Sequence, residues 1–547
     1  MRVRLSGGRL YDPAQGWDGQ IGDLYMEGGR LVEAPEDPNA VDRVIDVAGR
    51  VVMAGGIDIH THIGGGKVNL ARTLLPPDTC AAHGPVHGLE TPVPPAPDAG
   101  RLYALMGYTT AIEPAVLPAN ARHAHLEMAD TGPLDTGGYA LLGNDDFLLQ
   151  LLADEAEQEL IDHYVGWILE KTRCLGIKVV NPGGINAFKY NVRRMDLDVP
   201  NPRYGVTPRT VVRRLAEAVD NLGVPKPLHV HTCNLGVPGN IETTLKTIEA
   251  AEGHRIHLAH VQFHSYDTGG SRGFSSGALR LAEAVNANPN VTVDVGQVQF
   301  GQTVTISADA PLQHRAGQHA HPKRWIGADL ECEAGCGVVP FQYRDEAFVN
   351  ALQWAVGLEV FLGIADPWRV FLTTDHPNGG PFTTYPHLIR LLMDRTYRND
   401  RLEAVHGGAA KHSELAGVER SLDLGEIAAM TRCGPARLAG LRDRGHLAPG
   451  GVADVTVYPY LDDAEAMFEA PEMVFKNGEV IVENGELVAR PPGETLFVQP
   501  DYDRAVEARI TPYFRECMTV APVNYGVRDE DLLAGGRGLN QQPCGSR

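Results

Sequence analysis

The sequence predicts an α/β protein built around a (β/α)8 TIM barrel, with a small composite β-sandwich domain that both ends of the chain supply. The first observation behind this prediction is that strand-like apolar runs alternate with amphipathic helical stretches between about residues 53 and 440, which is the pattern of a parallel sheet. The second is that eight such runs occur, and eight parallel strands close a barrel whose functional site lies at their carboxyl ends.

The eight predicted strands are spaced so that helices fit between them. Amphipathic stretches predict helices over Asp145–Thr172, Pro208–Leu222 and Ser275–Ala287, and Asn240 is expected to cap a further helix that runs to Ala251. In chain order the predicted strands are Gly55–His62, Tyr108–Glu113, Gly138–Gly143, Leu175–Asn181, Pro227–Thr232, Arg255–Val261, Val291–Phe300 and Arg369–Asp375.

Outside the barrel, short β-like runs with glycine turns occur at both ends of the chain. Residues 1–52 and 441–500 together predict the composite β domain, and residues 53–440 form the predicted catalytic barrel. Two long irregular insertions, 64–100 and 308–340, leave from strand carboxyl ends. We therefore expect both insertions to lie over or beside the site.

The bulk composition limits the classes of function. The chain has 547 residues, 43% of them hydrophobic, and a formal net charge of −21. Binding to nucleic acid or to a membrane surface needs a basic field, so neither partner is expected. The N-terminus shows no apolar signal segment, and no apolar run reaches the length of about 20 residues that a membrane helix needs. The eight cysteines are scattered and do not resemble a disulfide framework, so we expect a cytoplasmic protein. The C-terminal tail, 501–547, is polar, and we expect it to contact a partner.

Residues that bind metals gather at the carboxyl ends of five predicted strands. A single histidine in a strand is usually a core or surface residue, but convergence from five strands on the functional face of one barrel is not explained in that way. Two histidines that are two positions apart on a strand project from the same face. The candidates are His60 and His62 in strand one, Lys178 in strand four, His229 and His231 in strand five, His257 and His260 in strand six, and Asp375 with His376 in strand eight.

Lys178 is unusual among these residues because it lies in an apolar strand. A buried ammonium group is costly unless it is paired or neutralised. A desolvated lysine with a lowered pKa can add carbon dioxide, which gives a carbamate with two oxygens that can bridge two metal ions. The alternative is an ordinary ion pair with an aspartate or glutamate.

The order H-x-H, Lys, His, His, Asp along a barrel with split β flanks resembles the binuclear amidohydrolase superfamily of metallo-dependent hydrolases. Within it, the chain is similar to the family of A subunits of formylmethanofuran dehydrogenase and of the bacterial formyltransferase/hydrolase complex. The similarity spans nearly the whole chain. The segments that carry it are Ala54–His62, Lys178–Gly184, His229–Asn240, His257–Tyr266, Gly296–Gln302 and Thr374–Asn378.

The resemblance implies two divalent metal ions, expected to be zinc, that share carboxylated Lys178 as a bridge. The implied ligands are His60, His62, the Lys178 carbamate and Asp375 for one ion, and the carbamate, His231 and His260 for the other, with His229 and His257 as the alternatives in strands five and six. Asp375 would also be the catalytic acid and base. The implied substrate contacts are Asn234, His264, Gln297 and His376.

The implied activity is the reversible hydrolysis of the formamide of an N-formylated, methanofuran-type C1 carrier to formate and free amine. The chain would work as one subunit of a formyltransferase/hydrolase or dehydrogenase complex, and the net direction stays open. One alternative is a cyclic amide hydrolase of hydantoinase or dihydroorotase type, although hydantoinase-type relatives carry a tyrosine shortly after the bridging lysine, where this chain has Pro182-Gly183-Gly184. The other alternative is a metal-free barrel that serves as a scaffold subunit.

Overall fold

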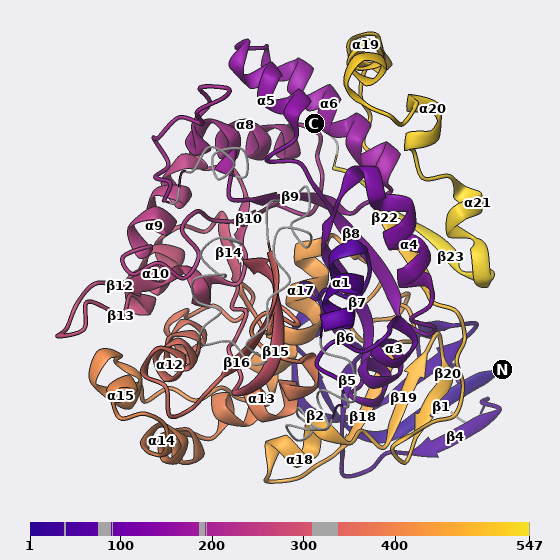
Figure 1. Cartoon of the computed structure of the whole chain (residues 1–547). Coiled ribbons are helices and arrows are strands. Elements are labelled where there is room, and N and C mark those ends of the chain that lie inside the picture. Colours follow the sequence, from indigo (N-terminus) through magenta and orange to yellow (C-terminus); the bar gives the residue numbers. More distant parts are fainter. Residues whose placement is uncertain are drawn as a thin grey trace.

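A parallel β-barrel forms the centre of the molecule (Figure 1). The computed structural model describes residues 1–37, 40–74, 89, 91–184, 192, 194–308 and 337–545. In this part of the chain eight parallel strands lie side by side in sequence order, which confirms the predicted fold class. The strands are β6 (Gly56–Asp58), β7 (Tyr108–Val116), β8 (Asp135–Leu141), β9 (Gly176–Val180), β10 (Leu228–His231), β11 (Ile256–Leu258), β14 (Val291–Asp294) and β17 (Val370–Phe371).

The barrel closes where the segment after β6 meets the segment after β17. Thr61 and His376 form a parallel bridge, and the backbone N–H of His62 donates to the His376 carbonyl at 2.8 Å. The Thr373 hydroxyl donates to the His60 carbonyl, also at 2.8 Å. The closing seam therefore consists of the segments that carry the predicted ligands of strands one and eight.

Helices cover the outside of the barrel, and none of the described helices combines the length and apolar character needed to cross a bilayer. Those before β17 are α1 (Gly66–Leu74), α3 (Ala96–Leu105), α4 (Ala121–Ala129), α5 (Asp146–Ala153), α6 (Gln158–Thr172), α8 (Pro208–Asn221), α9 (Ile241–Ala250), α10 (Ala278–Ala287) and α12 (Phe348–Gly363). After β17 come α13 (Tyr385–Met393), α14 (Arg395–Ala404), α15 (Gly408–His412), α16 (Leu424–Ala428), α17 (Gly434–Ala439) and α18 (Ala464–Glu469).

The helix ends differ from the predictions for local reasons. The single helix expected over Asp145–Thr172 is two helices, α5 and α6, because Glu155 takes a left-handed φ of 53° between them. The helix expected from Ser275 begins at Ala278, because Ser275 and its neighbour pair with a short strand at Tyr266. Asn240 precedes α9 as expected, but its side chain bonds the backbone of Asn234, Phe263 and Tyr266 instead of capping the helix.

A mixed sheet beside the barrel joins the two ends of the chain. Its central contact is the antiparallel pairing of β5 with β18, and residues from both ends, such as Leu5, Val52, Val455 and Phe475, share one apolar cluster. β22 (Glu494–Val498) lies in the range expected for this domain, but it pairs with β8 of the barrel instead. The sheet strands are β1 (Arg2–Asp12), β2 (Trp17–Glu27), β3 (Arg30–Val32), β4 (Arg43–Asp46), β5 (Arg50–Ala54), β18 (Val455–Pro459), β19 (Met473–Lys476), β20 (Glu479–Glu483) and β21 (Glu486–Leu487).

The C-terminal tail packs on this same chain. It contains α19 (Glu507–Cys517), α20 (Pro522–Tyr525), α21 (Asp529–Leu532) and β23 (Gly538–Gln542). Tyr525 stacks on Trp167 of α6 with ring centroids 5.5 Å apart, and Phe514 meets the same indole edge to face. β23 extends the barrel sheet by pairing with β22. Contact of the tail with a partner stays a prediction.

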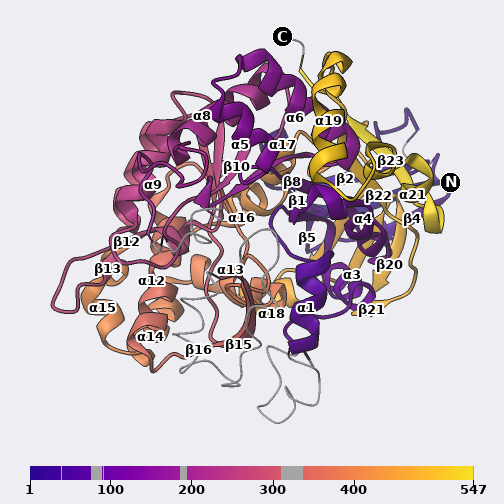
Figure 2. The ribbon, with the colours of Figure 1, turned by 45° about the horizontal axis from the view of Figure 1, so that its top comes forward.

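Parts of both insertions meet at the carboxyl end of the barrel. The first contributes α1. The second, 308–340, begins at the last residue of β15 (Gly301–Ala308) and ends within β16 (Gly337–Tyr343), and these two strands pair as a hairpin. Residues 75–88, 90 and 309–336 lie outside the described part of the chain. Val68 of α1 and Ile306 of the hairpin belong to one apolar cluster, and Figure 2 shows the two elements side by side. The hairpin is held next to Asp375, because Asn378 Oδ1 accepts the Ile306 N–H at 2.7 Å.

A buried ion cluster ties the composite sheet to the barrel. Lys476, at the end of β19, is fully buried, and its Nζ lies 2.6 Å from Asp135 of β8 and 2.7 Å from Asp454. Arg444 pairs with the same Asp135 and, at 2.9 Å, with Glu494. Buried charges need such compensation, so the junction is sensitive to the loss of any one partner.

We expect Lys476→Met to destabilise the fold by about 3–5 kcal/mol, because two buried carboxylates lose a shared cation. Urea unfolding followed by circular dichroism would measure the loss. The control is Arg528→Ala, whose guanidinium is 64% exposed beside Asp531, so its loss should change stability far less. Equal losses in the two variants would contradict the structural role of the cluster.

Candidate metal centre

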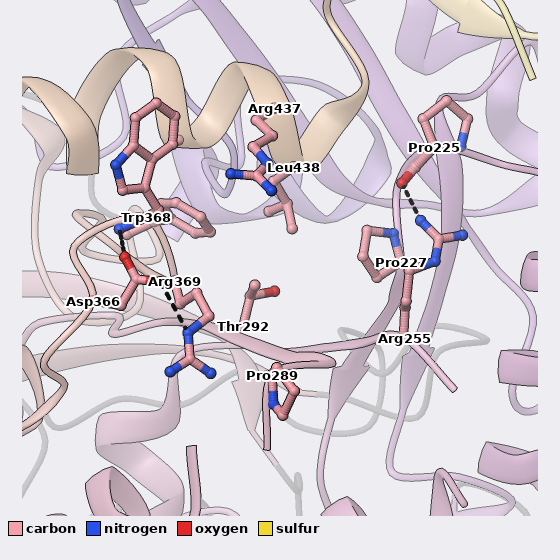
Figure 3. Close-up of a pocket in the computed structure, with 12 residues that line it drawn as sticks. Pro225, Pro227, Arg255, Pro289, Thr292, Asp366, Trp368, Arg369, Arg437 and Leu438 are labelled. Carbon is pink, nitrogen blue, oxygen red and sulfur yellow. Dashed lines mark hydrogen bonds and ion pairs between the residues drawn. The ribbon is translucent and has the colours of Figure 1, made fainter. Parts of the chain in front are cut away.

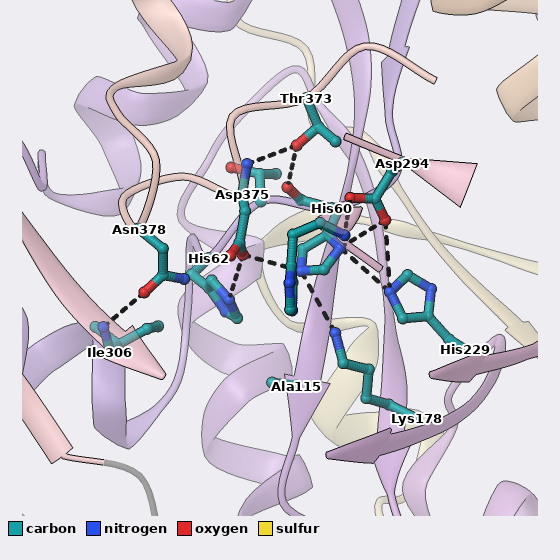
Figure 4. Close-up of polar contacts among 12 residues, drawn as sticks. His60, His62, Ala115, Lys178, His229, Asp294, Ile306, Thr373, Asp375 and Asn378 are labelled. Atoms are coloured by element: carbon teal, nitrogen blue, oxygen red, sulfur yellow. Dashed lines mark hydrogen bonds and ion pairs between the residues drawn. The ribbon is translucent and has the colours of Figure 1, made fainter. Parts of the chain in front are cut away.

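The segments after β6 and β17 and strand β9 bring four candidate ligands together (Figure 4). His60 Nε2 lies 3.0 Å from Asp375 Oδ1, and His62 Nε2 lies 3.3 Å from the same oxygen. Lys178 Nζ is 3.4 Å from His60 Nε2. All four side chains are buried, with Lys178 only 2% exposed. This first cluster unites four of the residues expected to hold a metal ion.

A second cluster of three imidazoles lies beside the first. The ring centroids of His231 and His260 are 4.5 Å apart, and His264 lies 5.0 Å from His231 and 5.2 Å from His260. His60 links the two clusters, since its ring lies 5.3 Å from that of His260. In each cluster, nitrogen and oxygen atoms of three residues are close enough to share one ion.

Two of the candidate ligands lie at strained backbone corners. His260 and Asp375 take left-handed φ angles of 34° and 51°, which cost of order 1–3 kcal/mol each for residues other than glycine. The corner at His260 is tight enough that a side chain at Gly296 would collide with His260 Cβ. At the other corner, the Asp375 N–H donates to the Thr373 hydroxyl at 2.8 Å. Such strain is typical of functional sites, where the surrounding structure holds a side chain in place.

The electrostatics keep most of these groups in the forms that bind cations; the exception is His62, where burial lowers the pKa but Glu113 and Asp375 raise it above its usual value. Burial lowers the pKa of the Lys178 amine to about 8 and holds the pKa of His231 and of His264 well below the usual value. Burial alone would raise the pKa of Asp375, but His260 and His60 keep it well below its usual range. Neutral imidazoles and an ionised carboxylate are the states that metal ions require.

Several buried polar atoms of the two clusters have no hydrogen-bond partner among the described residues. They include His231 Nε2, both ring nitrogens of His264, and Asp375 Oδ2. An unpaired buried polar atom is costly in a native protein, so such atoms call for a bound group. The donor set of imidazoles and a carboxylate suits a borderline cation such as Zn²⁺, and the residues therefore fit divalent metal ions.

His229 and His257 form a layer beneath the two clusters. His229 Nε2 lies 3.2 Å from His60 Nδ1, and His257 Nε2 lies 3.0 Å from Asp294. His229 Nδ1 has no hydrogen-bond partner among the described residues, as is true of His231 Nε2 and both nitrogens of His264. His60, His229 and Asp294 also lie close enough to share one ion, so the choice of His231 and His260 as ligands over His229 and His257 stays a prediction.

Sequence reasoning missed two carboxylates that hold the ligands of strand one. Asp294 Oδ2 lies 2.9 Å from His60 Nδ1, and Glu113 Oε1 lies 2.7 Å from His62 Nδ1. Both interrupt buried strands, Asp294 at the end of β14 and Glu113 within β7. The same signal that singled out Lys178, a charged residue in an apolar strand, would have found them.

The four residues expected to contact substrate divide into two pairs. His264 belongs to the second cluster, and His376 is buried beside the seam, with its ring 4.8 Å from that of Phe382. The amides of Asn234 and Gln297 bond the backbone, although Gln297 Oε1 has no hydrogen-bond partner among the described residues, and their contact with substrate stays a prediction. Asn234 Oδ1 accepts the Met195 N–H at 2.9 Å, and Gln297 Nε2 donates to the carbonyls of Val298 and Trp354 at 3.0 Å.

A separate hollow of about 440 Å³, the basal cavity, lies at the opposite end of the barrel (Figure 3). Arg255 and Arg369, which line it, immediately precede β11 and β17, so it opens at the amino ends of the strands. Trp368, Arg437 and Thr292 also border it. None of the candidate ligands lines this cavity, and functional sites of such barrels lie at the other end.

Comparisons with known proteins agree with this geometry. A family model described as "Amidohydrolase family" matches residues 43–482. The A subunit of the formyltransferase/hydrolase complex Fhc of Methylorubrum extorquens is 46% identical over 94% of either chain. Protein FwdA of Methanocaldococcus jannaschii is 39% identical over 97% of either chain. A chain of the solved formyltransferase/hydrolase complex FhcABCD of Methylorubrum extorquens, in complex with methylofuran, matches 99% of this chain and 100% of its own length, with 44% identity and a TM-score of 0.92.

We expect the purified protein to carry about two divalent ions per chain and His231→Asn to carry about one, because one cluster loses a ligand. His229→Asn is the matched control, since it changes a histidine of the same strand that lies in the lower layer, and it should keep both ions. Elemental analysis of the three proteins gives the stoichiometries. If His229→Asn lost an ion and His231→Asn kept both, the assignment of the two layers would be reversed.

Proposed function

The chain belongs to the amidohydrolase family, and on this premise we propose that it hydrolyses the formamide of an N-formylated C1 carrier of the methanofuran type to formate and the free amine. The observation that carries the proposal is the position of Lys178. Its buried amine lies next to His60 of the first cluster, and the His60 ring in turn lies next to His260 of the second cluster. A group that joins two clusters of ligands at the carboxyl end of a barrel suits a binuclear hydrolase. The relatives point to the carrier, because the solved complex that matches this chain was crystallised with methylofuran.

Two divalent ions, with zinc the expected metal, would be held by these clusters. His60, His62, Asp375 and carboxylated Lys178 would hold one, and the same carboxylated lysine with His231 and His260 would hold the other. When bound, such ions polarise a carbonyl and lower the pKa of water toward neutrality. The remaining steps, which are ligand positioning, proton transfer and substrate binding, are carried out by side chains of this protein.

The bridging role of Lys178 requires carboxylation of its Nζ. The neutral amine adds to carbon dioxide, so that an N–C bond forms, one proton leaves, and a carbamate with two oxygens results. Two features favour this step. Burial lowers the pKa of the Lys178 amine to about 8, so part of it is uncharged near neutral pH. The contact of Nζ with His60 Nε2 at 3.4 Å also brings the new oxygens among the imidazoles.

Asp375 is the proposed acid and base. Its carboxylate is buried, ionised and without a hydrogen-bond donor on Oδ2 among the described residues, so it can accept a proton. It takes one proton from water as the new C–O bond forms at the formamide carbon. It then delivers this proton to the nitrogen as the C–N bond breaks, and the products are formic acid, which ionises to formate, and the amine.

His264 and His376 are the proposed substrate contacts. His264 is fully buried, with both ring nitrogens unpaired in the described part of the chain, so it can donate one hydrogen bond and accept another. We further propose that the chain acts within a multi-subunit complex, as its solved relative does in FhcABCD. The α1 and β15–β16 elements beside the site and the C-terminal helices are candidate contact surfaces.

Asp375→Asn should lower formate release by about 10²–10⁴-fold, because an amide cannot carry the proton. The assay uses the native complex isolated through the tagged chain, an N-formylated methanofuran-type carrier, and enzymatic detection of formate. Asp366→Asn, at the other end of the barrel, is the control and should leave turnover near the wild-type rate. Wild-type protein that opened dihydroorotate but released no formate would favour a cyclic amide hydrolase.

Lys178→Met should lose both ions while the fold is retained, because methionine fills the apolar space but cannot form the carbamate. Elemental analysis and native mass spectrometry, which should show one added carbon dioxide on wild type, test this. Lys226→Met is a close control, since Lys226 is also fully buried in the barrel and its Nζ has no hydrogen-bond partner among the described residues. Full metal content in Lys178→Met would contradict the bridge.

A further inference from the structure

Asp294, at the end of β14, touches residues of both clusters. Its Oδ2 lies 2.9 Å from His60 Nδ1, and its Oδ1 accepts the backbone N–H of His260 at 2.7 Å. The second contact fixes a left-handed corner, because His260 has a φ of 34°. One fully buried carboxylate thus holds a candidate ligand of the first cluster by its ring and one of the second cluster by its backbone.

His257 holds Asp294 from the other side, and Thr292 in turn holds His257. His257 Nε2 lies 3.0 Å from Asp294 Oδ2, and His257 Nδ1 lies 2.8 Å from the Thr292 hydroxyl. Thr292 also borders the basal cavity of Figure 3. A hydrogen-bonded chain of Thr292, His257, Asp294 and His60 therefore runs from the far end of the barrel to the candidate metal centre.

The chemistry of the acceptor decides which nitrogen of His60 is free. An ionised carboxylate only accepts hydrogen bonds, so His60 Nδ1 and His257 Nε2 must both carry their protons. His60 Nε2 then keeps its lone pair, and this is the atom that faces Asp375 and Lys178. His257 Nδ1 in turn accepts from the Thr292 hydroxyl, so each member of the chain has one possible tautomer.

We infer that Asp294 is the positioning residue of the metal centre: it fixes the tautomer and orientation of His60 and the backbone corner at His260. Carboxylates that bond the outer nitrogen of a ligating histidine commonly raise metal affinity by 10–100-fold. In the described part of the chain Glu113 bonds the His62 ring and nearby backbone, including the N–H groups of Ile63 and Ala115, whereas Asp294 acts on both clusters. The inference rests on the proposed function only in requiring metal ions at this site.

The test is metal affinity in the full-length protein, measured with Zn²⁺ and Co²⁺ against a competing chelator, together with the absorption spectrum of the cobalt form. We expect Asp294→Asn to bind about 10–100-fold more weakly and to change the cobalt spectrum, because the amide places a donor against one imidazole N–H. The matched control is Asp162→Asn. Asp162 is buried and accepts from Gln158 at 2.7 Å and Asn221 at 2.9 Å, far from any candidate ligand, so metal affinity should not change.

Two more variants separate positioning from general stability. His257→Gln keeps an N–H donor for Asp294 and should retain most of the affinity, whereas His257→Leu should not. If Asp294→Asn does not fold, Thr292→Val gives the same test from the far end of the chain, with a loss of up to about tenfold. Wild-type affinity and an unchanged cobalt spectrum in Asp294→Asn, or in Thr292→Val if only that variant folds, would overturn the inference. These measurements need no substrate, so a wild-type protein that binds ions but releases no formate would refute the proposed function alone.

Discussion

His60 stands between two buried carboxylates, with Nδ1 2.9 Å from Asp294 and Nε2 3.0 Å from Asp375. The rest of the site depends on this double contact. Two carboxylates inside an apolar barrel are unfavourable unless positive charge or hydrogen-bond donors surround them. The imidazoles from strands one, five and six supply part of that compensation, and the unpaired nitrogens and oxygens that remain leave room for cations.

The scaffold keeps this polar interior from relaxing. The corner at His260 is bonded to Asp294 of the neighbouring strand β14, and the corner at Asp375 is bonded to Thr373, whose hydroxyl donates to the His60 carbonyl across the seam. These bonds hold both side chains in place. Outside the barrel, the buried cluster around Lys476 and Asp135 fixes the composite sheet against β8. The N-terminal and C-terminal segments thus stabilise the barrel from outside, although neither contributes a candidate ligand.

Much of the fold could be predicted from periodicity and strand count, because alternating strands and helices leave few arrangements other than a closed parallel barrel. The inward direction of His60 and His62 followed from their spacing on a strand. Asp294 could have been singled out as a charged residue in an apolar strand, but its contact with His60, 234 positions away, could not be predicted from the sequence. Whether Asn234 and Gln297 contact substrate stays a prediction, because an amide in a loop can bond either the backbone or a ligand, and sequence alone does not show which of its atoms are already paired.

The way the barrel closes has a consequence for its biogenesis. The seam joins Thr373 to His60 across 313 positions, so the first cluster is not assembled until the last strand has been made. Chains are synthesised from the N-terminus, and domains fold as units when their parts are present. During translation, His60 and His62 therefore lack their contact with Asp375 until about three hundred further residues have been synthesised. The first cluster can therefore assemble only after β17 has emerged, late in synthesis of the barrel.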